Sequence, residues 1–322
     1  MGKKANTAKD LKTFVNSKKC IMKPFTIYHT CHDSFSLLQK SLVDIIVKVT
    51  NPDMIFLLGV SLQRRKSESI FNEQAPSAQH ISDCTLLILI SDLSTNGLHE
   101  WQDKIENHCK RIMPVTTLVL KTATFQLWLK AGHQFALSAW NASPMLYHAD
   151  SVCKEDILVA PAPVNNKDAA KQWEEGLSKA KEFLVGAELY RVRKQHKMSA
   201  FMLHQSAEHA LLALLVTGTG YHPNTHSIDR LIRYGSLIAY QLPDVFPRKT
   251  DQDKRLFSLL QKAYIDTRYK EDYDITEEEL LTLAEKVSRI HEILSITGAA
   301  FINKPLVCTQ LSDVRQQTQD DI

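Results

Sequence analysis

The sequence lacks any long apolar run. No stretch of its 322 residues reaches the roughly 18–20 consecutive apolar residues that a membrane-crossing helix requires. The first residues contain lysines but no apolar core of the kind that a secretory signal has, and Gly2 is not followed by the serine or threonine of a myristoylation site. We therefore expect a protein with no membrane anchor and no export signal.

Cysteine is sparse and unpatterned. The six cysteines occur singly, at positions 20, 31, 84, 109, 153 and 308, with no CxxC pair and no spacing typical of a disulfide framework. Such cysteines are typical of reduced thiols, so we expect a cytoplasmic protein. The zinc motif HExxH is also absent. His204 and Glu208 have a spacing that can bind zinc, but without a third ligand nearby we interpret them as polar residues at an interhelical or dimer seam. No metal site is predicted.

Basic charge is concentrated at the N-terminus. The net charge is +3, and seven lysines lie within the first 23 residues. Residues 1–30 are therefore interpreted as a basic tail. A tail of this kind is typically a solvated chain end, although it can also contact nucleic acid.

Residues 31–158 alternate between helical and strand-like patterns. Apolar residues at helical spacing predict helices at 34–50, 97–112 and 123–143, and continuous apolar runs predict buried strands at 54–60, 84–91 and 114–121. The polar stretch 61–80 is predicted to be a loop. This alternation indicates an α/β domain, and the segment 159–166, which contains proline and asparagine, indicates a linker after it.

Residues 167–300 are helical throughout. Five amphipathic segments follow one another through short connections, which indicates an all-α, up-down helical bundle. The third helix is predicted to be capped by Asn224 or Thr225, and the fifth by a capping box between Thr276 and Glu279. Residues 301–322 are interpreted as a C-terminal tail.

Two short stretches in the α/β half carry a resemblance to a known family. They are LLGVSLQRR at 57–65, which follows a strand, and SDCTLLIL at 82–89, which opens a later strand. The chain from about residue 35 to residue 295 resembles the bacterial proteins that fuse a minimal nucleotidyltransferase domain to a HEPN domain, the higher-eukaryote and prokaryote nucleotide-binding module. In that family the first stretch reads Gly-Ser-x-x-x-Gly, and the second reads Ser-Asp-x-Asp.

The nucleotidyltransferase motifs are degenerate in this chain. Such enzymes hold two Mg²⁺ ions with carboxylates on one side of a strand, because side chains i and i+2 point the same way. Gly59, Ser82 and Asp83 match the motifs, but Val60 replaces the serine of the first motif, and Arg64 falls where its second glycine would lie.

Only one of the three metal carboxylates is left. Thr85 replaces the second aspartate, and the strand at 114–121, where the third acid would lie, contains threonines at those positions. A neutral hydroxyl holds a hard divalent ion less well than a carboxylate does, so we expect an inactive nucleotidyltransferase-like domain without Mg²⁺. The alternative for Asp83 is a helix cap or a strand-end carboxylate that faces solvent. The resemblance makes a vestigial site of Gly59, Ser61, Ser82, Asp83 and Thr85.

The helical half carries the second part of the resemblance. The matching stretches are HQSAEHALLALL at 204–215, NTHSI at 224–228 and DTRY at 266–269. Many HEPN proteins are ribonucleases that use an arginine to hold the phosphate and a histidine four to six residues later to move a proton. Here Tyr273 stands in the place of the histidine after Arg268, and tyrosine, with a pKa near 10, is a poor base at neutral pH. Arg191 and His196 fit the spacing by coincidence, at the end of the first helix.

The resemblance also implies a surface that faces nucleotide or RNA. Arg268, Tyr269 and Tyr273 would grip a phosphate and stack on a base, and His226 would orient its loop or contact a partner. The alternative is that Arg268 pairs with a nearby aspartate and that the two tyrosines cover the end of the bundle.

These residues are compatible with three functions. The first is a noncatalytic nucleotide- or RNA-binding protein with an inactive nucleotidyltransferase-like domain, which the resemblance makes a homodimer through its HEPN bundle. The second is a HEPN ribonuclease of toxin–antitoxin type that the first half restrains, and the third is a protein-binding scaffold. The missing carboxylates and the missing histidine favour a protein that is not an enzyme. No cofactor is required, and a purine nucleotide is the candidate ligand.

Overall fold

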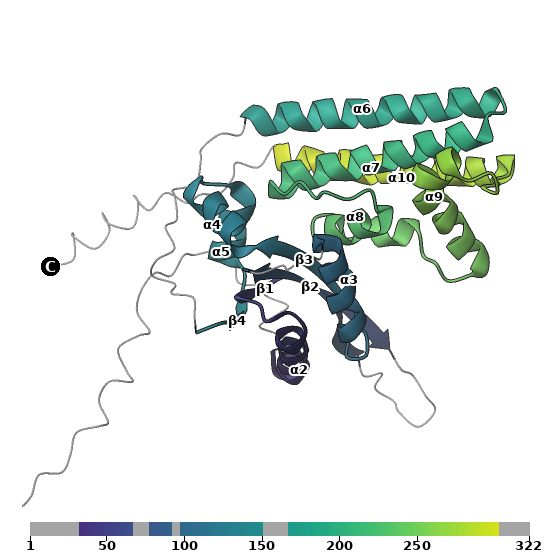
Figure 1. Cartoon of the computed structure of the whole chain (residues 1–322). Coiled ribbons are helices and arrows are strands. Elements are labelled where there is room, and N and C mark those ends of the chain that lie inside the picture. Colours follow the sequence, from purple (N-terminus) through teal and green to yellow (C-terminus); the bar gives the residue numbers. More distant parts are fainter. Residues whose placement is uncertain (1–31, 67–76, 92–96, 151–166, 303–322) are drawn as a thin grey trace, which may run out of the picture.

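The computed structural model describes residues 32–66, 77–91, 97–150 and 167–302. As the sequence patterns predict, the first half is an α/β domain and the second half is an all-α bundle (Figure 1). The predicted tail 1–30, the linker 159–166 and nearly all of the predicted tail 301–322 lie outside the described residues. Within the described ranges, none of the helices combines the length and hydropathy that crossing a bilayer requires.

The α/β domain is built on a mixed four-stranded sheet with the strand order β3-β2-β1-β4. Strands β2 and β3 run parallel, whereas β1 is antiparallel to both β2 and β4. In chain order the elements are α2 (His32–Thr50), β1 (Met54–Lys66), β2 (Ser77–Ile90), α3 (Leu98–Cys109), β3 (Val115–Lys121), α4 (Thr122–Lys130), α5 (Gln134–Ala142) and β4 (Met145–His148).

Two predicted boundaries in this half are wrong. Strands β1 and β2 continue beyond their apolar runs until Lys66 pairs with Ser77, so residues 61–66 and 77–80 are strand rather than loop. Backbone pairing between antiparallel strands does not require apolar side chains, which is why the hydrophobic pattern misses it. The single helix predicted at 123–143 is two helices, because the chain passes through a left-handed conformation at Gly132, where φ is 72°.

The two faces of the sheet belong to two different cores. Leu86 and Ile88 of β2 pack with residues of α2 and α3. Leu87 and Leu89 belong to a core that continues through α4 and α5 into the helical bundle. Since side chains alternate along a strand, the odd-numbered residues from Asp83 to Leu89 lie on the face that is turned toward the bundle; a bulge at Ser82 shifts the alternation, so that Ile81 packs in the other core.

The bundle contains the helices α6 (Lys167–Val192), α7 (His196–Thr219), α8 (Ile228–Gly235), α9 (Asp251–Tyr269) and α10 (Glu277–Ile302), with a short 3-10 turn η2 (Leu242–Val245) between α8 and α9. Helices α6, α7 and α10 run side by side, and the short helix α8 lies between α7 and the sheet (Figure 1). The α/β half meets the bundle both where α8 packs on β3 and where α5 packs on α7.

The caps of the helices confirm one prediction and correct another. The predicted capping box opens α10: Glu279 N donates to Thr276 Oγ1 at 3.2 Å, and Thr276 N donates to a Glu279 carboxylate oxygen at 3.0 Å. Helix α8 is capped by Ser227, whose hydroxyl accepts from the backbone amide of Arg230, rather than by Asn224 or Thr225. The loop continues further than expected before the helix begins.

Candidate functional site

The structure gathers all five residues of the vestigial nucleotidyltransferase site. Gly59 of β1 pairs with Thr85 of β2, and Ser61 pairs with Asp83. The Asp83 carboxylate accepts hydrogen bonds from the hydroxyls of Ser61, at 2.9 Å, and Ser82, at 3.1 Å. The one acidic residue of the motif is therefore bound by two neutral serine hydroxyls.

The third acidic position is also filled by a neutral side chain. Thr116 of β3 pairs with Thr85 of β2, so two threonines lie side by side where the resemblance implies two carboxylates. Among the residues that the structure describes, no three His, Cys, Asp or Glu side chains form a group that could hold a metal ion. Asp83 and Thr85 alternate with Cys84 and Leu86, so they lie on the same face of β2 as Leu87 and Leu89, the face turned toward the bundle.

Residues of the bundle cover this face. A Cβ atom at Gly59 would lie 2.4 Å from Cδ2 of Leu237, which follows α8, so a side chain at position 59 would force Leu237 to move. Nη1 of Arg233, on α8, lies 3.3 Å from the Thr116 hydroxyl oxygen. The surface on which the resemblance would place a nucleotide is thus occupied by a leucine and an arginine of the same chain.

Glu106 of α3 organises the contact with α8. Its carboxylate accepts from Arg230 at 3.2 Å and from Arg233 at 2.9 Å. It also accepts from the backbone amide and the hydroxyl of Thr117, both at 3.0 Å. Burial alone would lower the pKa of Arg230, but its neighbours Glu106, Tyr234 and Asp103 together outweigh burial and raise it above its usual value. Arg230 is therefore a buried cation, and its charge is matched by acids of the α/β half.

Arg268 lies on an exposed aromatic surface at the end of α9. Its guanidinium carbon is 4.5 Å from the ring centre of Tyr264, 5.2 Å from that of Tyr269 and 5.5 Å from that of Phe201. Tyr269 is 75% exposed. Among the residues that the structure describes, no aspartate pairs with Arg268, unlike in the alternative above; its Nε donates to the Tyr264 carbonyl oxygen at 2.8 Å.

His226 joins the same surface through Tyr264. The imidazole stacks on the Tyr264 ring with 4.1 Å between ring centres and an interplanar angle of 19°. Nδ1 of His226 lies 3.0 Å from Oε1 of Glu208, whose other oxygen is 3.2 Å from Nε2 of the buried His204. His204 and Glu208 thus form the polar interhelical seam that their spacing suggests, and His204 also reaches the Leu260 carbonyl oxygen on α9 at 2.9 Å.

Glu208 fixes the state of the His226 ring. Burial alone would raise the pKa of Glu208, but hydrogen bonds from His204 and His226 outweigh burial and hold it below its usual value. An ionised carboxylate only accepts hydrogen bonds, so Nδ1 of His226 carries the proton in this contact. In the neutral ring Nε2 is then the atom with a free lone pair, on a side chain that is 53% exposed. The bundle therefore presents an arginine and an oriented imidazole around a single tyrosine.

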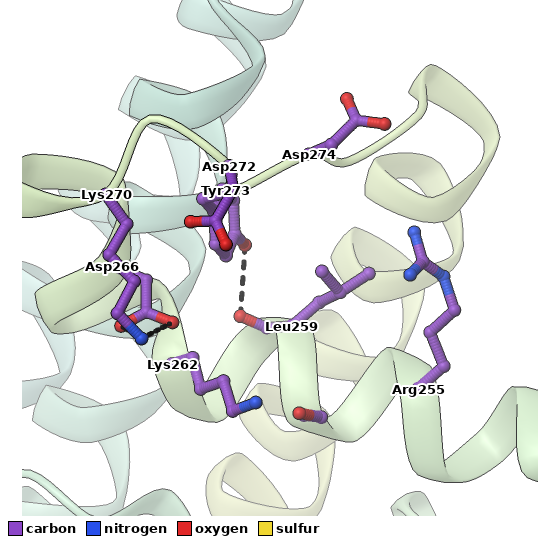
Figure 2. Close-up of a pocket in the computed structure, with 9 residues that line it drawn as sticks. Arg255, Leu259, Lys262, Asp266, Lys270, Asp272, Tyr273 and Asp274 are labelled. Atoms are coloured by element: carbon purple, nitrogen blue, oxygen red, sulfur yellow. Dashed lines mark hydrogen bonds and ion pairs between the residues drawn. The ribbon is translucent and has the colours of Figure 1, made fainter.

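Tyr273 does not join this surface. Its side chain is 6% exposed, and its hydroxyl donates to the Leu259 carbonyl oxygen at 3.0 Å (Figure 2). Tyr273, Leu259 and Lys262 line a cavity of about 320 Å³. Arg268 follows Lys262 by six residues on α9. Since a helix turns by about 100° per residue, the two side chains point about 120° apart around the helix axis, so Arg268 lies on another side of the helix. The expected grip of Arg268 and Tyr273 on one ligand is therefore not seen.

The cavity itself has mixed charge. Lys270 pairs with Asp266 at 3.1 Å on its wall, as Figure 2 shows, and Arg255 pairs with Glu279 at 2.6 Å. The remaining acidic wall residues are Asp272 and Asp274. With two of its cations neutralised and two further carboxylates beside them, this cavity does not favour a phosphate.

Tyr264 is the central residue of this surface, and the sequence patterns do not single it out. It lies four residues before Arg268, a spacing that places two side chains on the same face of a helix, so this signal was available. Its contact with His226 could not be found in the same way, since that residue lies 38 positions earlier in the chain. Glu106 was missed for the same reason.

Comparisons with known proteins agree with the helical half of this description. Residues 173–297 match the family model of the HEPN domain. No curated protein matches the chain. Among solved structures, the chain matches a nucleotidyltransferase-like protein from Exiguobacterium sibiricum 255-15, with 11% sequence identity over 86% of this chain and 78% of that chain. The TM-score of 0.26 is too low for this likeness to carry an argument about fold or function.

Proposed function

We propose that this protein, whose helical half is a HEPN domain, is a noncatalytic nucleotide- or RNA-binding protein with an inactive nucleotidyltransferase-like domain. The observation that supports the proposal is the exposed cluster of Arg268, Tyr264 and His226 beside Tyr269. A guanidinium recognises a phosphate through paired hydrogen bonds, and an exposed tyrosine accepts a base by stacking.

The state of the α/β half supports the noncatalytic part of the proposal. Binding of paired divalent ions requires several charged oxygen ligands. Asp83 is the one carboxylate of the motif, and two serine hydroxyls already donate to it. Leu237 and Arg233 occupy the sheet face beside it.

Fluorescence anisotropy with a labelled RNA 12-mer, and competition by AMP, test the proposal. Arg268→Ala should weaken binding of both, and Tyr269→Ala should weaken RNA binding by about 1–3 kcal/mol, the usual contribution of one stacked base. Arg289→Ala is the matched control, because Arg289 is an exposed arginine of α10 whose partner is Glu292. If wild type binds neither probe, or if Arg268→Ala binds as tightly as the control, the proposal fails.

A specific observation favours a second candidate function, a HEPN ribonuclease of toxin–antitoxin type. Glu208 orients His226 so that Nε2 is free to accept a proton, and Arg268 lies across the same tyrosine. A general base and a phosphate-binding cation are the groups that RNA cleavage without a metal requires. Cleavage by wild type in EDTA, lost in both His226→Ala and Arg268→Ala, would establish this function; intact RNA after prolonged incubation would dismiss it.

We further propose a cytoplasmic homodimer that pairs through the HEPN bundle, with a purine nucleotide or RNA as its ligand. The resemblance of the helical half supports the pairing. Sedimentation equilibrium measures the mass directly, and a mass of 36.6 kDa at micromolar concentration would correspond to a monomer and contradict the pairing.

A further inference from the structure

The buried residue His204 has a hydrogen-bond acceptor at each of its two ring nitrogens. Nδ1 lies 2.9 Å from the Leu260 carbonyl oxygen, and Nε2 lies 3.2 Å from Oε2 of Glu208. A carbonyl oxygen only accepts hydrogen bonds, so Nδ1 carries a proton. A neutral imidazole has a single N–H group. The contact at Nε2 therefore requires a second proton, which either the ring or the carboxylate holds.

The surroundings of Glu208 place this second proton on the ring. Oε2 of Glu208 also lies 3.3 Å from Nε2 of Gln205, and Oε1 lies 3.0 Å from Nδ1 of His226. Three donors around one carboxylate favour its ionised form. Burial raises the pKa of Glu208, but the hydrogen bonds from His204 and His226 outweigh burial and lower it below its usual value. His204 is then an imidazolium that is paired with an ionised Glu208.

The contacts of His204 suit a buried cation. The side chain is 0% exposed, and a charge in such a place persists only where it is paired and hydrogen-bonded. Both N–H groups of His204 have an acceptor, and its ring lies 5.5 Å from that of Tyr264, centre to centre. Among the described residues, Glu208 on α7 and Tyr264 on α9 are the ionisable groups in contact with His204. Helices α6 and α10 meet the other side of α7 through Ser206.

Two imidazoles flank Glu208, and one positive charge is enough to balance it. If His204 were neutral, the carboxylate would favour a second proton on His226. With the charge on His204, the half-exposed His226 needs only the proton at Nδ1, and its Nε2 keeps a lone pair. The Tyr264 ring then joins one cation, Arg268 at 4.5 Å, to one acceptor, His226 at 4.1 Å.

We propose that His204 is a positioning residue that carries a positive charge at neutral pH, balances Glu208 and thereby keeps Nε2 of His226 unprotonated. A ligand of this surface then places its phosphate at Arg268 and donates a hydrogen bond to His226 from a hydroxyl or an amino group. A second anionic group is disfavoured at His226, because the outward nitrogen presents a lone pair. For the ligand, the inference rests on the proposed function and deepens it, whereas the charge of His204 does not depend on that function.

Heteronuclear NMR of the full chain at pH 7 measures the protons on each ring. We expect protons on both nitrogens of His204 and on Nδ1 alone of His226. His204→Gln removes the charge but keeps a donor toward Glu208, and it should raise the titration midpoint of His226 by at least about one pH unit. Adding Glu208→Gln should return the midpoint to its wild-type value.

His209→Gln is the matched control. His209 is a partly exposed histidine of the same helix, and burial lowers its pKa, so that it carries no charge at pH 7. Its replacement should leave the midpoint of His226 unchanged. A single proton on His204 with the second on Glu208, or an unchanged midpoint in His204→Gln, would overturn the inference. The wild-type spectrum decides the charge of His204 even if His204→Gln does not fold.

Calorimetric titration with AMP between pH 5 and pH 8 tests the contact between ligand and His226. A ligand that donates to Nε2 binds the unprotonated ring, so its affinity should fall by up to about tenfold per pH unit below the midpoint of His226. His226→Gln supplies the baseline for protonation of the AMP phosphate, which has a pKa of about 6. A rise in affinity relative to this baseline would show that His226 binds as a cation, and would overturn the contact. If neither AMP nor the RNA 12-mer binds, the contact fails together with the proposed function, whereas the NMR result still decides the charge of His204.

Discussion

Replacing Glu106 with glutamine should loosen the contact between the two halves of the protein. The substitution keeps the size of the side chain but removes its charge, and it turns one acceptor oxygen into an NH₂ group that faces arginines. In the native protein this carboxylate accepts from Arg230, Arg233 and Thr117 at 2.9–3.2 Å. The Glu106 side chain is 16% exposed and that of Arg230 is 8% exposed, so water cannot easily replace the lost partner.

The geometry sets the expected size of the effect. A hydrogen bond to a charged group contributes about 1.5–3 kcal/mol, and breaking a buried ion pair costs about 3–5 kcal/mol because the remaining charge stays buried. Arg230 retains Asp103 at 2.6 Å, and Arg233 retains Asp229 at 3.1 Å. Since both arginines keep one acid, we expect a loss near the lower end, about 3 kcal/mol in the free energy of unfolding.

Urea denaturation followed by tryptophan fluorescence and circular dichroism measures this loss. A double-mutant cycle with Arg230→Met should give a coupling energy of at least about 1 kcal/mol. The exposed pair Arg289–Glu292 is the control, and its cycle should give no more than about 0.5 kcal/mol. A Glu106→Gln variant that loses less than about 1 kcal/mol would refute the view that this carboxylate holds α8 to the sheet.

Three further results are expected. Tyr273→Phe should lower the free energy of unfolding measured in urea by about 1 kcal/mol, because the Tyr273 hydroxyl donates to the Leu259 carbonyl oxygen. The variant should bind RNA as wild type does; weaker binding would show that Tyr273 contacts the ligand. The pKa of Glu208 is lowered in the folded protein, so its contribution is present above the unfolded value near 4.3 and is lost as pH falls through the folded value. The stability difference between wild type and Glu208→Gln should therefore be largest near pH 7 and shrink below pH 4, and a constant difference would show that the charge is not involved. Gly59→Ala should destabilise by about 0.5–1.5 kcal/mol, because the Leu237 side chain must leave its preferred rotamer, and Leu237→Ala should remove most of that penalty; strictly additive effects would contradict the contact.

The helices of the bundle could be predicted because each has one apolar face and strong local end signals. The fourth of the five predicted helical segments is α9, and the box between Thr276 and Glu279 marks the start of α10. The cap of α8 could not be chosen from the sequence, since Asn224, Thr225 and Ser227 are all suitable residue types. The extended β1–β2 ribbon was missed because its pairing is made by the backbone and not by an apolar pattern.

The candidate site was predictable only residue by residue. The resemblance pointed to the cluster around Asp83, whose members are close together, and to a second group in which Arg268, Tyr269 and His226 gather around Tyr264 while Tyr273 is buried elsewhere. The resemblance could not supply two tertiary contacts. One is the position of Tyr264 between Arg268 and His226, and the other is the packing of the α8 arginines against the sheet. Those contacts depend on how one half packs on the other, which no local pattern encodes.

The core that extends from the sheet into the bundle has a consequence for how the two halves evolve. Tyr234 donates its hydroxyl to the Thr117 carbonyl oxygen, and the Tyr221 ring lies 4.8 Å from that of Phe135, so aromatic residues of the bundle are covered by the α/β half. A HEPN domain transplanted from another protein would bring side chains shaped for a different cover. Recombination within the segment that joins the halves would thus have to rebuild this packing, and the two halves should be inherited as a pair.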